Sequence, residues 1–341
     1  MPRQAENGRV GIKDVATTAG VAISSVSRVL SGHPDVSAEM KARVLEAVEA
    51  VGYEPDFLAQ SLRRGVTSTV GFLVGDISNP LFSEIAVGAE LALQEAGFAM
   101  IIANSQGAPE QDAAQLRVLR QRRVDGMIVS LADERNRVAA RLLRDMGRPF
   151  VLVDREITGA GATSAVLSDH AAGMRAAAAH LIDLGHRRIG FAGGTPTVRP
   201  TRARADALVE ACAGRRGVRA VVDCGAFTAE HGELATARML DSATPPTAII
   251  AGGNQLLVGV LRAIRARGLH VPGDISLVTC DTTPLAELLE PPLARITRDA
   301  RELGRMAATL MLGAMQGNRA RRIELPVEFS PGESCAAPGA R

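Results

Sequence analysis

The chain has 341 residues, 46% of them hydrophobic and 22% charged, and its 39 basic side chains nearly balance its 37 acidic ones. At about 100–200 residues per domain, this length predicts two or three domains, and the apolar fraction excludes a disordered protein. No stretch reaches the roughly 18 uncharged apolar residues of a membrane span, and the N-terminus has no apolar signal segment. We therefore expect a cytoplasmic protein.

The N-terminal residues 1–55 predict a head of three short helices. Residues 12–19 and 23–31 repeat apolar side chains at helical spacing and are separated by a break at Gly20. A third helix is predicted from Ser37 to Gly52, because glycine often follows the last turn of a helix. This order is typical of a helix-turn-helix unit.

In such a unit the second helix lies in the DNA major groove, and its outward N-terminal residues meet base edges. Arginine can contact guanine with two hydrogen bonds, while serine hydroxyls and helix N-termini suit phosphate oxygens. The candidate DNA-contacting residues are Ile23, Ser24, Ser25, Ser27, Arg28 and Ser37. The alternative is a three-helix packing module whose serines and arginine only face solvent.

The charge of the head is balanced but unevenly placed. Residues 1–65 contain eight basic and eight acidic side chains, yet residues 1–30 hold four basic against two acidic ones. Residues 31–56 hold two basic against six acidic ones. Positive charge therefore gathers where DNA would be contacted, which gives modest support to DNA binding.

From residue 69 onward, strands and helices alternate, which predicts parallel sheets covered by helices on both faces. The number of strands exceeds one doubly wound unit, so we predict two α/β lobes that divide near residues 165–170. The run 323–329 is predicted as one more strand, and the Pro/Gly/Ala-rich residues 330–341 as a flexible tail. The predicted strands are 69–75, 98–103, 126–130, 150–153, 164–167, 188–192, 218–222, 247–251 and 275–279, and the helices are 82–96, 110–122, 170–184, 203–212, 230–240 and 254–267.

Several segments together resemble the lactose-repressor (LacI/GalR) family. They include IKDVATTAGVAISSVSRVL in the head and VGFLVGDISNPLF, PFVLVDRE, HLIDLGHRRIGFAGG and RARGLHVPGDISLVTCD in the body, and the resemblance spans roughly residues 11–330. It implies a repressor that binds a palindromic operator as a homodimer. It also implies a hinge helix at 56–65, with Leu62 inserted between base pairs in the minor groove. Two departures concern helix caps, because Gly11 and Ala22 stand where the family usually has Thr and Ser.

The resemblance further implies a body like that of periplasmic sugar-binding proteins, with an N-lobe at 66–168 plus a return segment near 298–320, and a C-lobe at 169–297 plus the strand 323–329. Ligands of such folds bind where the carboxyl ends of the strands meet. The polar and aromatic candidates at these ends are Asn79, Leu81, Phe82, Asp154, Arg155, Arg202, Arg204, Phe227, Asn254, Asp281 and Arg298.

Carboxylates and amides beside arginines suit a hydroxyl-rich effector, and phenylalanine suits the apolar face of a sugar. Arg298 replaces a glutamine that is common in sugar-binding relatives, which favours an anionic sugar derivative, with a neutral pentose or hexose as the alternative. Arg298 could instead pair with Asp154 or Asp281. The sequence leaves open whether the effector releases DNA or tightens its binding.

Enzyme and metal functions have little support. The sequence has no GxxxxGK[ST], GxSxG or HExxH motif. Its cysteines, which are Cys212, Cys224, Cys280 and Cys335, show no CxxC pair, so we expect reduced thiols, no metal and no cofactor. The alternative function is a cytoplasmic sugar-binding protein or sugar-acting enzyme with a helical head that does not read DNA.

We expect dimers rather than tetramers. The predicted helices 82–96 and 110–122 have more apolar residues than one sheet face needs, including Ile85, Val87, Leu116 and Leu119. The tail 330–341 lacks the leucine heptads of a tetramerising coiled coil.

Overall fold

The computed structural model describes residues 10–30, 33, 35–53, 66–157, 163–281, 286 and 288–339. The chain divides into two compact units, Met1–Thr67 and Ser68–Arg341, called here the head and the body. The predicted hinge, with Leu62, lies outside the described residues. Within the described ranges, no helix is long and apolar enough to cross a membrane, and no group of three acidic, histidine or cysteine side chains could hold a metal ion.

The head is a helix-turn-helix unit, as predicted. Its helices are α1 (Ile12–Ala19), α2 (Ile23–Leu30) and α3 (Ala38–Val51). Val15, Val26 and Val44, one from each helix, are fully buried against one another. Gly20 ends α1 with φ of 64°, a left-handed conformation that glycine adopts without steric cost.

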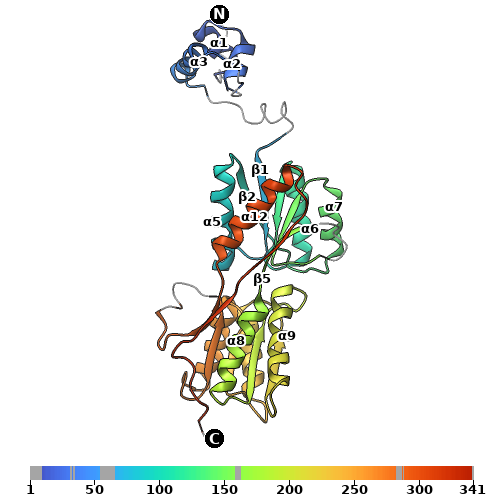
Figure 1. Cartoon of the computed structure of the whole chain (residues 1–341), viewed down its shortest axis with the longest axis vertical. Coiled ribbons are helices and arrows are strands. Elements are labelled where there is room, and N and C mark those ends of the chain that lie inside the picture. The colour runs from blue at the N-terminus through green and yellow to red at the C-terminus, as the bar shows by residue number, and fades with distance from the viewer. Residues whose placement is uncertain are drawn as a thin grey trace, which may run out of the picture. The chain divides into compact units, whose positions relative to one another are not determined.

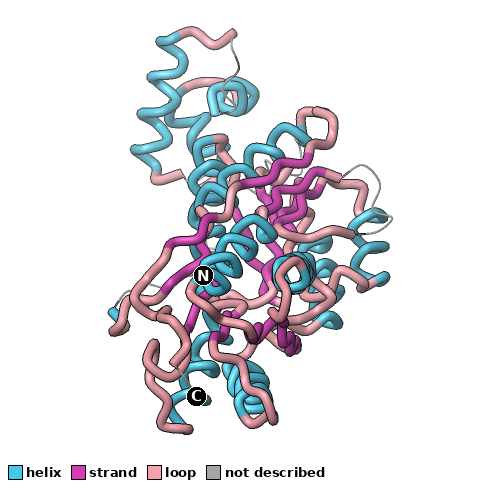
Figure 2. The backbone as a smooth tube through the Cα atoms, turned by 60° about the horizontal axis from the view of Figure 1, so that its bottom comes forward, coloured by secondary structure: helices cyan, strands magenta, loops and turns pink. Residues whose placement is uncertain are grey.

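The N-lobe is a six-stranded sheet in the order β11-β5-β4-β3-β1-β2, and all its strand pairs are parallel. Helices α5 and α12 pack on one face and α6 and α7 on the other, as Figure 2 shows for the layers. Its elements are β1 (Thr69–Val74), α5 (Pro80–Glu95), β2 (Ala99–Asn104), α6 (Pro109–Gln121), β3 (Gly126–Val129), α7 (Arg137–Asp145), β4 (Phe150–Val153), β5 (Ser164–Ser168), α12 (Ala300–Met315) and β11 (Arg322–Leu325).

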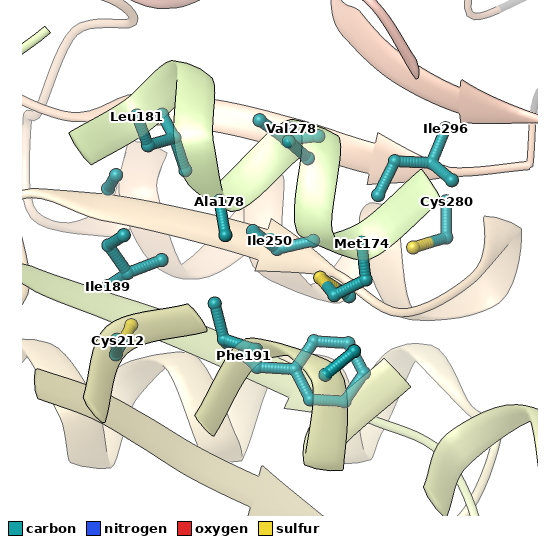
Figure 3. Packing of buried hydrophobic residues seen from close by; sticks show 14 of the residues in the cluster. Met174, Ala178, Leu181, Ile189, Phe191, Cys212, Ile250, Val278, Cys280 and Ile296 are labelled. Atoms are coloured by element: carbon teal, nitrogen blue, oxygen red, sulfur yellow. The ribbon is translucent and has the colours of Figure 1, made fainter. Parts of the chain in front are cut away.

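The C-lobe repeats this architecture with a sheet in the order β12-β10-β9-β8-β6-β7, in which only the β10–β12 pair is antiparallel. Phe191, Ile250 and Val278 point from the sheet toward Met174 of α8 in a closely packed core (Figure 3). Its elements are α8 (His170–Asp183), β6 (Arg188–Gly193), α9 (Arg199–Ala213), β7 (Arg219–Cys224), α10 (Ala229–Leu240), β8 (Ala248–Ala251), α11 (Asn254–Ala266), β9 (Ser276–Cys280), β10 (Ala294–Thr297) and β12 (Glu328–Ser330).

The chain passes between the lobes three times, after β5, after β10 and after β11 (Figure 1). The predicted strand 323–329 is therefore wrong as a single element: β11 pairs with β5 in the N-lobe, and β12 pairs with β10 in the C-lobe. A seven-residue apolar run could not reveal this division, because the crossing keeps both halves extended.

The expected flexible tail also differs from the structure. Ser334 is fully buried, and its hydroxyl donates to the carbonyl of Leu277 at 2.6 Å. The carbonyl of Ala336 accepts a hydrogen bond from the hydroxyl of Ser276 at 3.1 Å. The small residues of this segment predict disorder from sequence. In the structure they instead allow the segment to pack closely against the C-lobe.

Helix α5 packs against α12 with their backbones in contact. A side chain at Gly88 would place its Cβ 2.0 Å from the carbonyl oxygen of Arg301, so only glycine fits. The same approach buries Ile85, while Leu116 and Leu119 of α6 are buried on the opposite face. Three of the four apolar residues taken as a sign of dimerisation are thus core residues, and only Val87 is exposed.

Candidate functional site: an interlobe cleft and a helix-turn-helix head

A cleft of about 1030 Å³, including its opening to solvent, lies where the carboxyl ends of the two sheets face each other. Its lining includes every predicted effector residue except Arg202: Asn79, Leu81, Phe82, Asp154, Arg155, Arg204, Phe227, Asn254, Asp281 and Arg298. The lining also includes Asp76, Gln106, Ser130, Thr195, Thr228 and Gln255, which the sequence analysis did not select. Asp76 follows the first predicted strand, as Asn79 does, and the others stand just beyond strands or at helix starts, which are positions too common in the chain to single them out.

The apolar part of the cleft comes from one phenylalanine of each lobe. Phe82 lies in the first turn of α5, and its ring would be 3.8 Å from a Cβ atom at Gly75. Phe227 follows β7 and packs so closely on Gly194 that a Cβ there would lie 2.2 Å from the ring. Gly194 therefore makes room for the ring of Phe227 at the cleft wall.

Arg298 connects the two lobes at the base of the cleft. Its Nε donates to Oδ1 of Asp281 in the C-lobe at 3.0 Å, and its Nη1 pairs with Oδ2 of Asp154 in the N-lobe. Nη1 also donates to the hydroxyl of Ser168 at 3.1 Å. The side chains of Arg298, Asp154 and Asp281 are 5%, 6% and 9% exposed, so water does little to screen these ion pairs.

Asp154 and Asp281 occupy matching positions in the two lobes, directly after β4 and β9. Both adopt left-handed backbone conformations, with φ of 49° and 62°. Such conformations are uncommon outside glycine and tend to occur at functional positions. Each lobe thus presents one strained, buried carboxylate to the same guanidinium.

The charge state of this cluster follows from burial opposed by ion pairing. Burial alone would raise the pKa of Asp154, but Arg298 and then His170 hold it well below its usual range. Burial would likewise raise the pKa of Asp281, and Arg298 and Arg204 lower it instead. Burial lowers the pKa of His170 to about 4, so its ring is neutral near pH 7. The cluster therefore contains ionised carboxylates and a neutral histidine.

The other two arginines of the cleft are also engaged. Arg204 donates to the carbonyl of Gly252 at 2.9 Å and lies 3.4 Å from Oδ2 of Asp281. Arg155 donates to the carbonyls of Leu131 and Asp154 at 2.5 and 2.9 Å. The Nε of Arg204 and the Oδ1 of Asn254 are nevertheless buried without a hydrogen-bond partner among the described residues, so both can still bind a hydroxyl.

Polar side chains also meet across the mouth of the cleft. Gln255 of α11 donates to Oδ2 of Asp76 at 2.6 Å, and Asn254 donates to Oδ1 of Asn79 at 3.4 Å. These contacts join the C-lobe to the N-lobe in a closed arrangement.

Arg202 does not line the cleft, and its contact with an effector stays a prediction. Its Nη2 instead pairs with Oε2 of Glu134 at 2.6 Å, while the backbone N–H of Arg199 donates to Oε1 of the same carboxylate at 2.7 Å. Glu134 of the N-lobe thus accepts from the first backbone N–H of α9 and from a side chain one turn later. Sequence reasoning missed Glu134 because nothing near it in the chain marks a partner from the other lobe.

In the head, the predicted DNA-contacting side chains lie along one side of α2. Ile23 is 45% exposed, and Ser24 and Arg28 are exposed, whereas Val26 and Val29 face the core. The set is completed by Ser25 and Ser27, which are half-buried, and by Ser37, whose hydroxyl accepts a hydrogen bond from the backbone N–H of Met40 at 3.2 Å. The face of α2 away from the core thus presents polar groups with a single apolar side chain.

A helix-turn-helix head joined to a two-lobed body with an interlobe cleft defines a ligand-responsive transcription regulator. Comparison with known proteins supports this class. Residues 11–56 match the model described as bacterial regulatory proteins, lacI family, and residues 178–335 match a periplasmic binding protein-like domain. The ribose operon repressor of Haemophilus influenzae is 31% identical over 88% of this chain and 90% of its own length. The chain belongs to the LacI family, and it is a DNA-binding transcription regulator rather than an enzyme.

Two solved structures extend the similarity. The lac repressor dimer bound to operator and the anti-inducer ONPF has a TM-score of 0.84 at 25% identity, covering 97% of this chain and 100% of that one. A LacI-family regulator from Enterococcus faecium with bound ribose has a TM-score of 0.69 at 29% identity, covering 79% of this chain and 99% of that one.

Proposed function

We propose that the protein is a homodimeric repressor that binds a palindromic operator through α2 and is switched by a neutral sugar in the interlobe cleft. The observation that best supports this function is the association of an exposed reading face on α2 with a closed, polar cleft in the body. A single helix-turn-helix reads only a few base pairs, so a dimer is needed for useful affinity and specificity. A repressor acts on DNA, and we therefore propose a cytoplasmic location.

Operator binding is tested by selecting binding sites from random duplex DNA and measuring affinities by fluorescence anisotropy. The selected operator should be palindromic and should bind far more tightly than a random duplex. Arg28→Ala should weaken operator binding by about 1–3 kcal/mol if the side chain contacts guanine. Equal losses on operator and random DNA would show instead that Arg28 contacts only phosphates, and equal wild-type affinity for both would refute sequence-specific repression.

The dimer is supported by the assembly of the similar lac repressor and by exposed apolar residues on α5, where Leu91 is 56% and Val87 36% exposed. Light scattering should return a dimer. A Leu91→Glu variant should weaken dimerisation, whereas Val138→Glu, at an exposed position on α7, should leave it unchanged. Monomers in the wild-type protein would contradict the proposal.

A neutral effector follows from the charge balance of the cleft. The three lining arginines, Arg155, Arg204 and Arg298, are matched by the three lining aspartates, Asp76, Asp154 and Asp281. Arg298 is shared by two carboxylates, so its guanidinium is not available to an anion. This pairing reverses the preference for an anionic sugar derivative and favours the alternative, a neutral pentose or hexose. The ribose-bound structural relative supports the same class.

The effector class is tested by a thermal-shift screen of neutral sugars, sugar acids, sugar phosphates and purines. A ligand at a hundredfold excess over its Kd stabilises the folded protein by about 2.7 kcal/mol, which such a screen detects. We expect a neutral sugar to stabilise the wild type and Asp281→Asn to lose that response. Stabilisation by purines or sugar phosphates alone, or a response that persists in Asp281→Asn, would contradict the proposal.

A further inference from the structure

The face of the N-lobe that lies away from the cleft, at the amino ends of its parallel strands, is rich in arginine. This face, called here the N-lobe pole, is formed by the ends of α6, α7 and α12 and the loops that follow them. Its exposed arginines are Arg120, Arg122, Arg123, Arg144, Arg148, Arg319 and Arg321. The acidic side chains there are Glu95, Asp145, which pairs with Arg141, and the buried Asp125.

Part of this surface is hollow. A depression of about 800 Å³, including its opening to solvent, lies between the end of α7 and the end of α12. Arg144 and Arg148 line one side of it, and Asn318 and Ala320 line the other. Arg319 and Arg321 are neighbours of Ala320 in the chain and are exposed, but only Arg144 and Arg148 line the depression itself.

The position of this pole in the chain links it to DNA. The chain enters the body at Val66–Thr69, and β1 begins at the N-lobe pole. Only residues 54–65 separate this entry from Tyr53 of the head, and a segment of that length spans at most about 45 Å. The N-lobe pole is therefore tethered within reach of any DNA that the head holds.

The head itself supplies little electrostatic attraction. Residues 1–65 contain eight basic and eight acidic side chains, so their net charge is zero. Binding of duplex DNA ordinarily draws much of its affinity from the neutralisation of phosphates by arginine and lysine. In this chain the N-lobe pole of the body offers a further group of exposed basic side chains.

We propose that the N-lobe pole binds the phosphate backbone of the DNA that flanks the operator. Its arginines supply sequence-independent affinity, while α2 supplies sequence reading. This inference rests on the DNA binding of the head but adds a second contact surface that belongs to the effector-binding body. Movements of the N-lobe would then alter the DNA contact directly.

Arginine at helix C-termini also complements the helix dipole, and that effect alone would place arginines at this pole. The C-lobe provides the matched control. Its own pole, at the amino ends of its strands, carries the exposed residues Arg215, Arg216, Arg219 and Arg265, at the opposite end of the body (Figure 1). The helix dipole explains these C-lobe arginines equally well. They lie far, however, from the point at which the chain enters the body.

The test compares two fourfold variants with equal loss of charge. The N-pole variant replaces Arg122, Arg148, Arg319 and Arg321 with Gln, and the C-pole variant replaces Arg215, Arg216, Arg219 and Arg265 with Gln. All eight side chains are exposed and form no ion pair among the described residues. Thermal unfolding should therefore match that of the wild type in both variants.

Binding is measured by anisotropy over a range of salt concentrations on two duplexes. One ends at the edges of the selected operator, and the other is longer by about 15 base pairs on each side, roughly 50 Å at 3.4 Å per pair. The wild type and the C-pole variant should bind the long duplex on the order of tenfold more tightly at low salt. The N-pole variant should not show this gain, and its salt slope should fall by about 0.9 for each phosphate that it no longer neutralises.

Three results would overturn the inference: an unchanged gain in the N-pole variant, equal losses in both variants, or no gain in the wild type. Because phosphate binding does not depend on sequence, the same comparison is made on long and short random duplexes. A wild type without operator preference would refute the proposed repressor function, yet the random duplexes would still test the N-lobe pole. Failure of the proposed repressor function can thus be distinguished from failure of the proposed DNA contact at the N-lobe pole.

Discussion

Arg298 is held by a carboxylate of each lobe, and this makes one side chain important for both stability and closure. Removing one partner of a buried ion pair costs about 3–5 kcal/mol, because the remaining charge stays buried without compensation. Exposed pairs contribute only about 0–1 kcal/mol, because solvent screens them. The contribution of an arginine to the free energy of unfolding therefore depends more on whether its ion pairs are buried than on how many it makes.

We predict that Arg298→Leu lowers the free energy of unfolding at pH 7 by about 3–5 kcal/mol, since it leaves the buried carboxylates of Asp154 and Asp281 with only the longer contacts to Arg199 at 3.8 Å and Arg204 at 3.4 Å. Urea titration followed by circular dichroism measures this change. The control is Arg305→Leu, an exposed arginine whose half-buried partner Glu302 lies on the same helix; it should change stability by less than about 1 kcal/mol. Similar losses in both variants would show that the buried bridge has no special role.

His170 predicts a specific loss of stability in acid. Burial lowers its pKa to about 4 in the folded protein, from an ordinary value of 6.5. The unfolded chain therefore takes up a proton as the pH falls below about 6.5, while the folded chain resists it until about pH 4. Stability from this residue is complete above pH 6.5 and is lost progressively toward pH 4, by roughly 3 kcal/mol.

A His170→Gln variant should flatten this part of the pH profile. Unfolding titrations at pH 7.0, 6.0, 5.0 and 4.5 compare it with the wild type, and the difference between the two proteins should shrink or reverse as the pH falls. A constant difference at every pH would mean that the folded protein does not hold His170 neutral.

At the scale of secondary-structure elements, the helices of the head differ in how their first turns are satisfied. Ser37 caps α3 with its hydroxyl, whereas α1 has Gly11 before its first residue, and Asp14 reaches back to accept from the Gly11 N–H at 2.8 Å. Residue Ala22 precedes α2 and has no side-chain acceptor to offer. Helix α2, the proposed reading helix, thus starts without the side-chain cap that α3 has.

We predict that Ala22→Ser stabilises the head by about 0.5–2 kcal/mol, because the hydroxyl can accept from a free N–H of the first turn. The change is measured as the midpoint of the head's unfolding transition in urea. Ser24→Ala, inside the helix, is the control and should change the midpoint little. If Ala22→Ser gave no gain, the first turn of α2 would already be satisfied by solvent.

The elements also show what sequence patterns can predict. Strands such as β1 and β8 were predicted because apolar residues follow one another in short runs, as buried parallel strands require. Helix α7 was missed because it is only nine residues long, although its arginines and its buried apolar residues fall on opposite faces. Helix α12 was expected only as a return segment, because its many alanines and methionines mark no single face clearly.

The same limit applies to the cleft. Positions after strand ends could be predicted, since parallel sheets place them along one edge. The contact between Glu134 and Arg202 could not be predicted, because the two residues are far apart in the chain and nothing beside Glu134 marks a partner in the other lobe. The sequence suggested that Arg298 could pair with Asp154 or with Asp281, and the structure pairs it with both.

At the scale of the whole molecule, closure of the cleft depends on few contacts at its mouth. We predict that Gln255→Glu opens the body, because a second carboxylate would face Asp76 in place of a donor. Losing a hydrogen bond to a charged group destabilises the closed body by about 1.5–3 kcal/mol. This lowers the ratio of closed to open molecules by roughly tenfold or more. Small-angle scattering at pH 7 should show a larger radius of gyration than for the wild type.

The matched variant Gln255→Ala removes the hydrogen bond without adding charge, so it should open the body less than Gln255→Glu does. Lowering the pH to about 4 should bring the two variants together, because carboxylates then begin to protonate. An unchanged radius in both would show that the other contacts between the lobes, at Arg298 and at Glu134, suffice to keep the cleft closed.

The threefold passage of the chain between the lobes has a consequence for biosynthesis. The N-lobe lacks α12 and β11 until residue 325 has been made, and the C-lobe lacks β12 until residue 330. A ribosome therefore releases both lobes to fold at nearly the same moment, after the head has long been complete. A prematurely terminated product would contain a finished reading head but no finished lobe, and its exposed sheets would mark it for removal before it could occupy an operator without control.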